Sequence, residues 1–236
     1  CQIEKRERVP FFGSEYPFEK GEEDSIGVSF LAGKIPSMGY RTYRIDYGKQ
    51  NPGSGFSFTG YSIENKFYKI TICPVTGGIE SIKDKEFNRE LVDRKSPYKL
   101  NQYIYEEIVS KEGRSAIFDD TVGYGCLGKK GRDAEFRRTS PVSSRIKKGK
   151  DGPLIGSLII ETKAKGCYKI TQEVILYSNL KRIDIENTLL KEEVLKPEGV
   201  YYAFPFNFKS PKIKFEIAGG VMRPEVDQLP HTAKDY

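Results

Sequence analysis

Apolar and polar side chains alternate along much of the chain beyond residue 60. Residues 67–72 and 79–83 each alternate with a period of two, and they flank a short segment that ends in Gly77 and Gly78. Two such runs around a Gly-Gly turn predict a β-hairpin. A dense apolar run follows at residues 154–162, and two alternating runs follow at residues 168–177 and 181–189. Because these runs are long and sequential, and the alternating ones are polar on one face, they predict antiparallel strands.

The other segments add shorter strands and one short helix. Residues 40–45 alternate and follow a Pro/Gly turn at residues 35–39, which predicts a strand after that turn. Residues 201–208 and 213–217 predict two more strands, whereas the segment 100–109 predicts a single short helix. A series of strands with almost no helix predicts an all-β fold class, an antiparallel β-sandwich.

A change in composition divides the chain. Residues 48–60 are rich in Gly, Ser, Pro and Asn, which is typical of a linker. We interpret residues 1–47 as the end of a preceding small β-sandwich domain, and residues 61–236 as the first part of a large β domain. The sequence opens at Cys1 without an initiating Met, which favours a piece excised from a longer protein.

The composition excludes several classes of protein. Hydrophobic residues make up 37% and charged residues 31%, which is typical of a globular chain. No apolar run approaches the roughly 20 residues that a membrane-spanning helix needs, so no membrane partner is expected. The net charge of +6 gathers in two basic stretches, residues 129–138 and 145–150. Because both stretches lie among turn residues, we interpret them as solvated loops and expect no nucleic-acid partner.

The cysteine and histidine counts limit metal and redox chemistry. The four cysteines are Cys1, Cys73, Cys126 and Cys167, and none lies in a CxxC pair. His231 is the only histidine, so this chain cannot supply a zinc site with two His ligands or most His-based catalytic pairs. We therefore expect no cofactor and no metal ligand in this chain. Reduced cysteines are the default in a cytoplasmic protein, which is the expected location.

The most unusual stretch is the segment 223–236, a loop with two prolines that gathers both charges, an imidazole and a phenol. Planar polar groups recognise sugar hydroxyls, and an aromatic ring packs against the apolar face of a sugar. We therefore take Arg223, Asp227, His231 and Tyr236 as candidate substrate-binding residues. A solvated loop on any β-sandwich can have the same composition, so that interpretation stays open. No residue is assigned a catalytic role.

Three segments carry a resemblance to a known family. Residues 36–43 read PSMGYRTY, and residues 63–92 contain an Asn-bearing strand, a Gly-Gly hairpin, an Asp-Lys pair and a Glu-Leu pair. This succession resembles glycoside hydrolase family 38, the α-mannosidases, at the junction of its small β domain and its large C-terminal domain. Residues 183–206 are similar to the middle of the same C-terminal domain. The matching positions in the second segment are Asn65, Gly77, Gly78, Asp84, Lys85, Glu90 and Leu91.

The resemblance implies a galactose-mutarotase-like supersandwich for the large domain. It also implies a parent enzyme that cleaves α-mannosides with retention, using a zinc ion and an aspartate nucleophile on an N-terminal α/β barrel. No stretch of this chain is similar to that barrel, so no catalytic or zinc-binding residue is carried over. We expect a non-catalytic β-sandwich portion of an α-mannosidase-like enzyme, inactive by itself. Its expected partners are an α-mannoside or another glycan and the zinc-bearing catalytic domain of the same chain.

Two functions of other classes remain as alternatives. A free-standing carbohydrate-binding module would use exposed aromatic platforms, and the absence of Trp counts against it. A mutarotase-like sugar isomerase would use His-based acid and base groups, and the single histidine counts against that reading.

Overall fold

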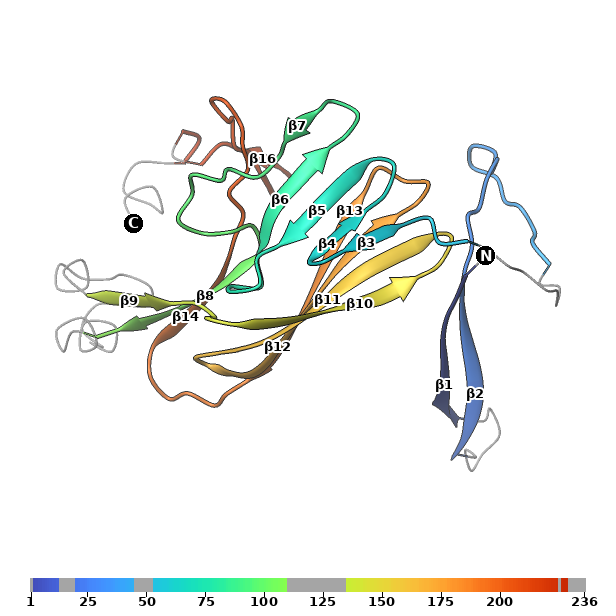
Figure 1. Ribbon diagram of the computed structural model, residues 1–236, viewed down its shortest axis with the longest axis horizontal. Coiled ribbons are helices and arrows are strands. Elements are labelled where there is room, and N and C mark those ends of the chain that lie inside the picture. Colours follow the sequence, from blue (N-terminus) through green and yellow to red (C-terminus); the bar gives the residue numbers. More distant parts are fainter. Residues whose placement is uncertain (1, 13–19, 45–52, 110–134, 225, 229–236) are drawn as a thin grey trace.

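The computed structural model describes residues 2–12, 20–44, 53–109, 135–224 and 226–228 (Figure 1). Every regular element in these described residues is a β-strand, and all of their strand pairs are antiparallel. Across the same residues, no helix has the length and apolar character needed to cross a membrane. The expected all-β fold class, an antiparallel β-sandwich, is confirmed.

The first layer of the sandwich is a five-stranded sheet in sequential order, built around the predicted hairpin. Ile70 lies opposite Ile82 across that hairpin. The turn needs both glycines, because Gly77 has a φ of +73° and a side chain on Gly78 would collide with Lys99. The strands are β3 (Ser57–Thr59), β4 (Ser62–Glu64), β5 (Tyr68–Ile72), β6 (Ile79–Asp84) and β7 (Arg89–Glu90).

The second layer is a four-stranded sheet, which contains the three long alternating runs that the sequence predicted. Each strand pairs with the next along the chain, so the layer is a simple meander. The four strands are β10 (Ser144–Asp151), β11 (Ile155–Ala164), β12 (Cys167–Tyr177) and β13 (Ile183–Lys191).

The main core lies between these two layers, which are stacked in Figure 1. Alternation along each strand sends one set of side chains inward, and this set is almost wholly aliphatic. On the first sheet, Ile63, Ile70 and Ile72 are completely buried, and Ile160 and Val174 are completely buried on the second. Burial of one such side chain contributes about 1.5–3 kcal/mol, so this interface is the main source of stability.

A third sheet has the order β14-β8-β9 and contains one element that differs from the prediction. Its strands are β8 (Gln102–Ile108), β9 (Phe136–Thr139) and β14 (Glu198–Ala203). The segment 100–109 was predicted as a helix, and that prediction is wrong. Every residue of β8 from Gln102 to Glu106 is buried, because the strand has neighbours on both edges and packing on both faces. Continuous burial hides the period of two that identifies a strand.

A second, smaller core joins this sheet to the four-stranded sheet. Tyr103 and Tyr105 of β8 pack with Cys167 and Ile170 of β12. The Tyr103 hydroxyl donates a hydrogen bond to the carbonyl oxygen of Lys165 at 2.9 Å. Burial together with the neighbouring Cys167 thiol raises the pKa of Tyr103 far above its ordinary value, so the hydroxyl stays protonated.

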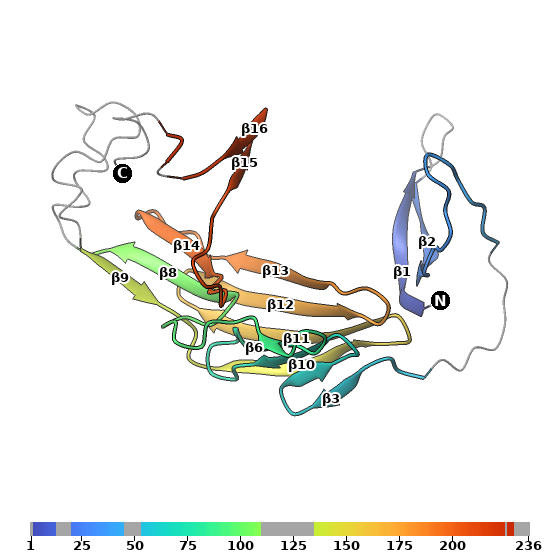
Figure 2. The ribbon, with the colours of Figure 1, turned by 90° about the horizontal axis from the view of Figure 1, so that it is seen from above.

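Two hairpins complete the described chain. One is formed by β1 (Gln2–Phe12) and β2 (Lys20–Ser29), and the other by β15 (Phe215–Ile217) and β16 (Gly220–Met222). Figure 2 shows the second hairpin projecting away from the sheets.

The junction between the first hairpin and the sandwich contains a second wrong prediction. Residues 40–44 are not in a strand, although the turn before them is present, with the Gly39 amide donating to the Pro36 carbonyl at 3.1 Å. An alternating segment becomes a strand only where it has a pairing partner. Strand β3 occupies the end of the expected linker at residues 48–60, and the division into domains stays a prediction.

Candidate functional site

The structure places two of the four predicted substrate-binding residues side by side. Arg223 directly follows β16, and its guanidinium donates from Nε and Nη2 to the Asp227 carboxylate at 2.6–3.2 Å. The backbone amide of Arg223 donates to Asp227 Oδ2 at 2.7 Å. His231 and Tyr236 lie outside the described residues. The loop therefore holds an Arg–Asp ion pair whose geometry is fixed by several hydrogen bonds.

The two groups of this pair fix each other's ionisation. The hydrogen bonds from Arg223 hold the pKa of Asp227 below its usual range. The same pairing with Asp227 raises the pKa of Arg223 above its usual range. Both groups are therefore charged at neutral pH. Together they present carboxylate oxygens as acceptors and guanidinium N–H groups as donors, which are the partners that sugar hydroxyls need.

An open groove of about 850 Å³ adjoins the pair. Arg223 and Asp227 line it together with the segment 211–214, which contributes Lys212 and Lys214. The apolar side chains of Ile213 and Val226 also line the groove and are 58% and 61% exposed. The groove thus combines charged and apolar surface.

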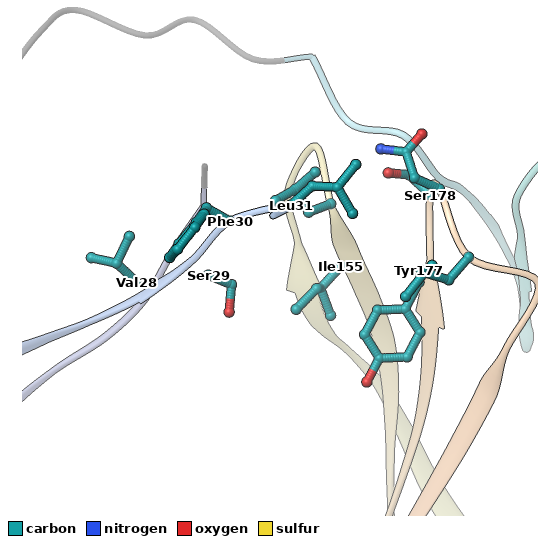
Figure 3. Close-up of a pocket in the computed structure, with 10 residues that line it drawn as sticks. Val28, Ser29, Phe30, Leu31, Ile155, Tyr177 and Ser178 are labelled. Carbon is teal, nitrogen blue, oxygen red and sulfur yellow. The ribbon is translucent and has the colours of Figure 1, made fainter. Parts of the chain in front are cut away.

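A second pocket, of about 350 Å³, lies where the N-terminal segment meets the sandwich. Figure 3 shows Phe30 and Leu31 of that segment on one side of the pocket, and Ile155 and Tyr177, at the ends of β11 and β12, on the other. None of its described lining residues is charged. Burial and the hydrogen bond to Asp184 raise the pKa of Tyr177 to about 12, so its hydroxyl is a neutral donor. An uncharged, mainly apolar lining of this kind favours the packing of one segment on another over a catalytic site.

The motif residues that carried the family resemblance have structural roles. Asn65 Oδ1 accepts hydrogen bonds from the backbone amides of Phe67 and Tyr68 at 2.8 and 2.7 Å. Its Nδ2 donates to the carbonyl of Tyr177 at 2.9 Å. One side chain therefore closes the β4–β5 turn and ties it to the end of β12 in the opposite layer.

Two carboxylates of the same motif, the buried Asp84 and the partly buried Glu90, hold the β6–β7 region. Glu90 accepts hydrogen bonds from the Ser81 hydroxyl at 2.5 Å and from the Ile82 amide at 2.9 Å. Burial opposes the ionisation of Glu90, but these bonds outweigh it and lower its pKa. Asp84 binds the turn amides of Glu86 and Phe87. Both groups thus bind backbone amides, and neither lines the groove of Arg223 and Asp227.

The family implies zinc, and the described residues do not fit a zinc site. Zinc in proteins is held by Cys, His and carboxylate groups that converge on one point. The described part of the chain contains no group of three or more such side chains close enough to hold a metal. Cys73 lies beside a turn, while Cys167 is buried against Tyr103. The two thiols therefore have different surroundings.

The structure also corrects the interpretation of the basic stretches. Residues 145–150 were predicted as a solvated loop, but they lie within strand β10. Residues 129–134 of the other stretch lie outside the described residues, whereas Arg137 and Arg138 lie in β9, where they pair with Glu107 and Glu106. The alternation of Arg145, Ile146 and Lys147 was the signal that could have identified β10, because it has the period of a strand.

Of the comparisons with known proteins, a family model gives the match that identifies the chain. The family model described as the C-terminal domain of glycosyl hydrolases family 38 matches residues 63–236. A search of curated proteins finds no significant match. Among solved structures, a protein in glycosyl hydrolase family 38 from Enterococcus faecalis is similar, with 13% sequence identity and a TM-score of 0.38. That match covers 80% of this chain and 24% of the other, so this chain spans about a quarter of that protein's length.

The extent of the family match decides the assignment. It begins at Ile63 in β4 and includes the first layer except β3, the whole second layer, the third sheet and the β15–β16 hairpin. The match thus covers most of the chain and the whole of its main core. The chain therefore belongs to the family of C-terminal domains of family 38 glycosyl hydrolases.

Proposed function

We propose that this chain is the non-catalytic β-sandwich portion of an α-mannosidase-like glycoside hydrolase. In that role it supports a zinc-dependent catalytic barrel elsewhere in the parent protein and contributes to the binding of an α-mannoside. Its membership of the family's C-terminal domain supports the proposal. The observation that carries it furthest is a row of aromatic side chains exposed after β14.

This aromatic row consists of Phe204, Phe206 and Phe208. The ring centroids are 6.3 Å apart in the first pair and 5.9 Å apart in the second, so the rings form one continuous surface. These side chains are 51%, 50% and 60% exposed, and they differ from most other exposed apolar residues in that their rings contact one another. Exposed apolar surface of this extent marks an interaction site.

The β15–β16 hairpin extends the same pattern. Phe215, Ile217 and Val221 remain about half exposed or more. An isolated two-stranded hairpin is only marginally stable in water. Packing against another part of the parent protein would stabilise both the hairpin and the aromatic row, as expected for a domain that supports a catalytic barrel.

The paired Arg223 and Asp227 support the second half of the proposal. They lie in a groove at the base of this hairpin and offer fixed acceptors and donors. A hydrogen bond to a sugar hydroxyl contributes about 1 kcal/mol. Loss of one such bond corresponds to roughly a fivefold loss of catalytic efficiency.

Hydrolysis of 4-nitrophenyl α-mannoside by the intact parent enzyme tests both halves. Replacing both Phe206 and Phe208 with Asp is expected to lower the melting temperature and the activity together. Val142→Asp is the matched control, since Val142 is 83% exposed and lies outside the row. Equal effects of the control and the Phe variant would contradict the supporting role.

A separate variant tests the proposed contribution to glycan binding. Asp227→Ala is expected to reduce kcat/KM roughly fivefold while the melting temperature stays unchanged, because the pair is exposed and contributes little to stability. Unchanged kinetics in Asp227→Ala would refute the glycan contact and leave the supporting role in place.

A further inference from the structure

One end of the four-stranded sheet contains a hollow that the proposed function does not use. It has a volume of about 500 Å³, and strands β10, β11 and β12 or their immediate ends contribute to it. Arg145 lies opposite Glu161 across the β10–β11 pair. Thr162 lies opposite Ile170 across the β11–β12 pair, which places Lys163 beside the start of β12. The hollow shares no residue with the groove of Arg223 and Asp227.

The charges around this hollow are strongly unbalanced. Its lining contains three cations, Arg145, Lys163 and Lys169, and one anion, Glu161. Glu161 is already engaged by Lys147 at 3.0 Å and by Lys169 at 3.2 Å. Among the described residues, neither Arg145 nor Lys163 forms an ion pair, and both are exposed. Two exposed cations of the lining thus form no ion pair with another described residue.

An aromatic ring completes the hollow. Tyr168 lines it and is 61% exposed. Its neighbours along β12, Cys167 and Ile170, are buried in the second core, so Tyr168 is not needed to fill that core. A large ring left in water beside a concave surface offers a flat apolar face to a ligand.

We propose that this hollow binds an anionic saccharide, a sugar that carries a phosphate or sulfate group. Arg145 and Lys163 would bind the anionic group through charge-assisted hydrogen bonds, which are the strong class of hydrogen bond. The ring of Tyr168 would pack against the apolar face of the sugar. The residues come from three strands of one rigid sheet, so the site is preorganised and needs little ordering on binding.

Calorimetric titration of the 236-residue chain tests the proposal with four probes: inorganic phosphate, glucose 6-phosphate, glucose 6-sulfate and glucose. Glucose 6-phosphate or glucose 6-sulfate is expected to bind more tightly than inorganic phosphate or glucose, because only the esters reach both the cations and the ring. The affinity should fall as salt is added, since the two cations are exposed and are screened.

Two variants separate the contributions. Arg145→Glu combined with Lys163→Glu should weaken binding of the preferred ester by about tenfold or more, because it removes hydrogen bonds to a charged group. Tyr168→Ala should lower the affinity for that ester towards the affinity for inorganic phosphate. Both variants change exposed side chains, so their circular dichroism spectra and melting temperatures should match those of the parent chain.

A matched control removes the effect of net charge. Lys95→Glu combined with Lys196→Glu changes the net charge by the same amount at exposed positions outside the hollow. This control should bind the esters as the parent chain does, and equal weakening would show diffuse attraction only and overturn the proposal. Absence of binding by both esters would also overturn it. If inorganic phosphate binds as tightly as the esters and Tyr168→Ala changes nothing, the saccharide assignment is wrong.

Discussion

Replacement of Asp84 by Asn tests whether the motif holds the two layers together. Asp84 is 1% exposed and accepts hydrogen bonds through Oδ1 from the backbone amides of Glu86 and Phe87 at 3.1 and 3.2 Å. Its Oδ2 lies 3.2 Å from the Lys181 ammonium and 3.7 Å from Arg89 Nε. Lys181 lies between β12 and β13, so this contact joins the β6–β7 turn to the opposite layer.

The geometry sets the size of the expected effect. Asn keeps an oxygen for the two turn amides but loses the charge that faces Lys181. Breaking a buried ion pair costs about 3–5 kcal/mol when the remaining charge has no partner. Here Lys181 retains Glu86 at 2.5 Å, so the smaller value for one hydrogen bond to a charged group applies, about 1.5–3 kcal/mol. We expect Asp84→Asn to lower the free energy of unfolding by about 2 kcal/mol at pH 7.

The effect should depend on pH with a definite sign. Burial opposes the ionisation of Asp84, but hydrogen bonds from Phe87, Lys181 and Glu86 outweigh it and hold its pKa below the usual range. The unfolded carboxyl has a pKa of about 3.9. The stabilisation is therefore fully present above that pH and is lost as the pH falls through the lower, folded pKa. Asn does not titrate, so the difference between variant and parent should shrink in strong acid.

Urea unfolding at pH 7 and at successively lower pH measures this difference. Asp93→Asn is the control, because Asp93 Oδ1 also accepts a hydrogen bond from a turn amide, that of Lys95 at 2.9 Å, without a buried ion pair. The control should stay within about 0.5 kcal/mol of the parent. A loss for Asp84→Asn no larger than the control, or a loss that stays constant down to strong acid, would refute the reasoning.

Two further predictions concern the backbone and the core. Gly166→Ala should destabilise by about 2–5 kcal/mol in urea unfolding, because φ is +81° and the added Cβ would collide with the Tyr105 ring. Gly60→Ala has a similar φ of +58° but open space around it, so it should cost only about 1–2 kcal/mol, and equal losses would contradict the steric argument. Ile160→Ala should cost about 2–5 kcal/mol by the same assay, since Ile160 is 0% exposed between the layers. A loss below 1 kcal/mol would show that the core is not where the structure places it.

Alternation and turn residues were enough to predict most of the sandwich. The β5–β6 hairpin was predictable because its strands are adjacent in sequence and its turn needs glycine at a positive φ. Strand β11 was predictable as a long, dense apolar run, and strand β12 as a long run whose apolar and polar residues alternate. In these elements the local pattern and the tertiary environment agree.

The wrong predictions occurred where neighbours in the tertiary structure, rather than the local sequence, decide the secondary structure. Strand β8 is buried on both faces, so its sequence carries no period of two. Residues 40–44 carry that period but have no pairing strand in the described structure. Residues 145–150 have the charge of a solvated loop, yet β11 pairs with them and makes them a strand.

The candidate sites show the same division. From the sequence alone we predicted substrate contacts for Arg223, Asp227, His231 and Tyr236, because one loop gathers both charges, an imidazole and a phenol, and that assignment stays a prediction. The sequence also identified Asn65, Asp84 and Glu90 as a motif, but only the packed layers show that these side chains bind turns and the opposite sheet. Arg145, Lys163 and Tyr168 are separated along the chain, and antiparallel register brings them to one hollow. Composition and alternation depend on near neighbours in sequence, whereas a site built across strands depends on register, which only the folded sheet fixes.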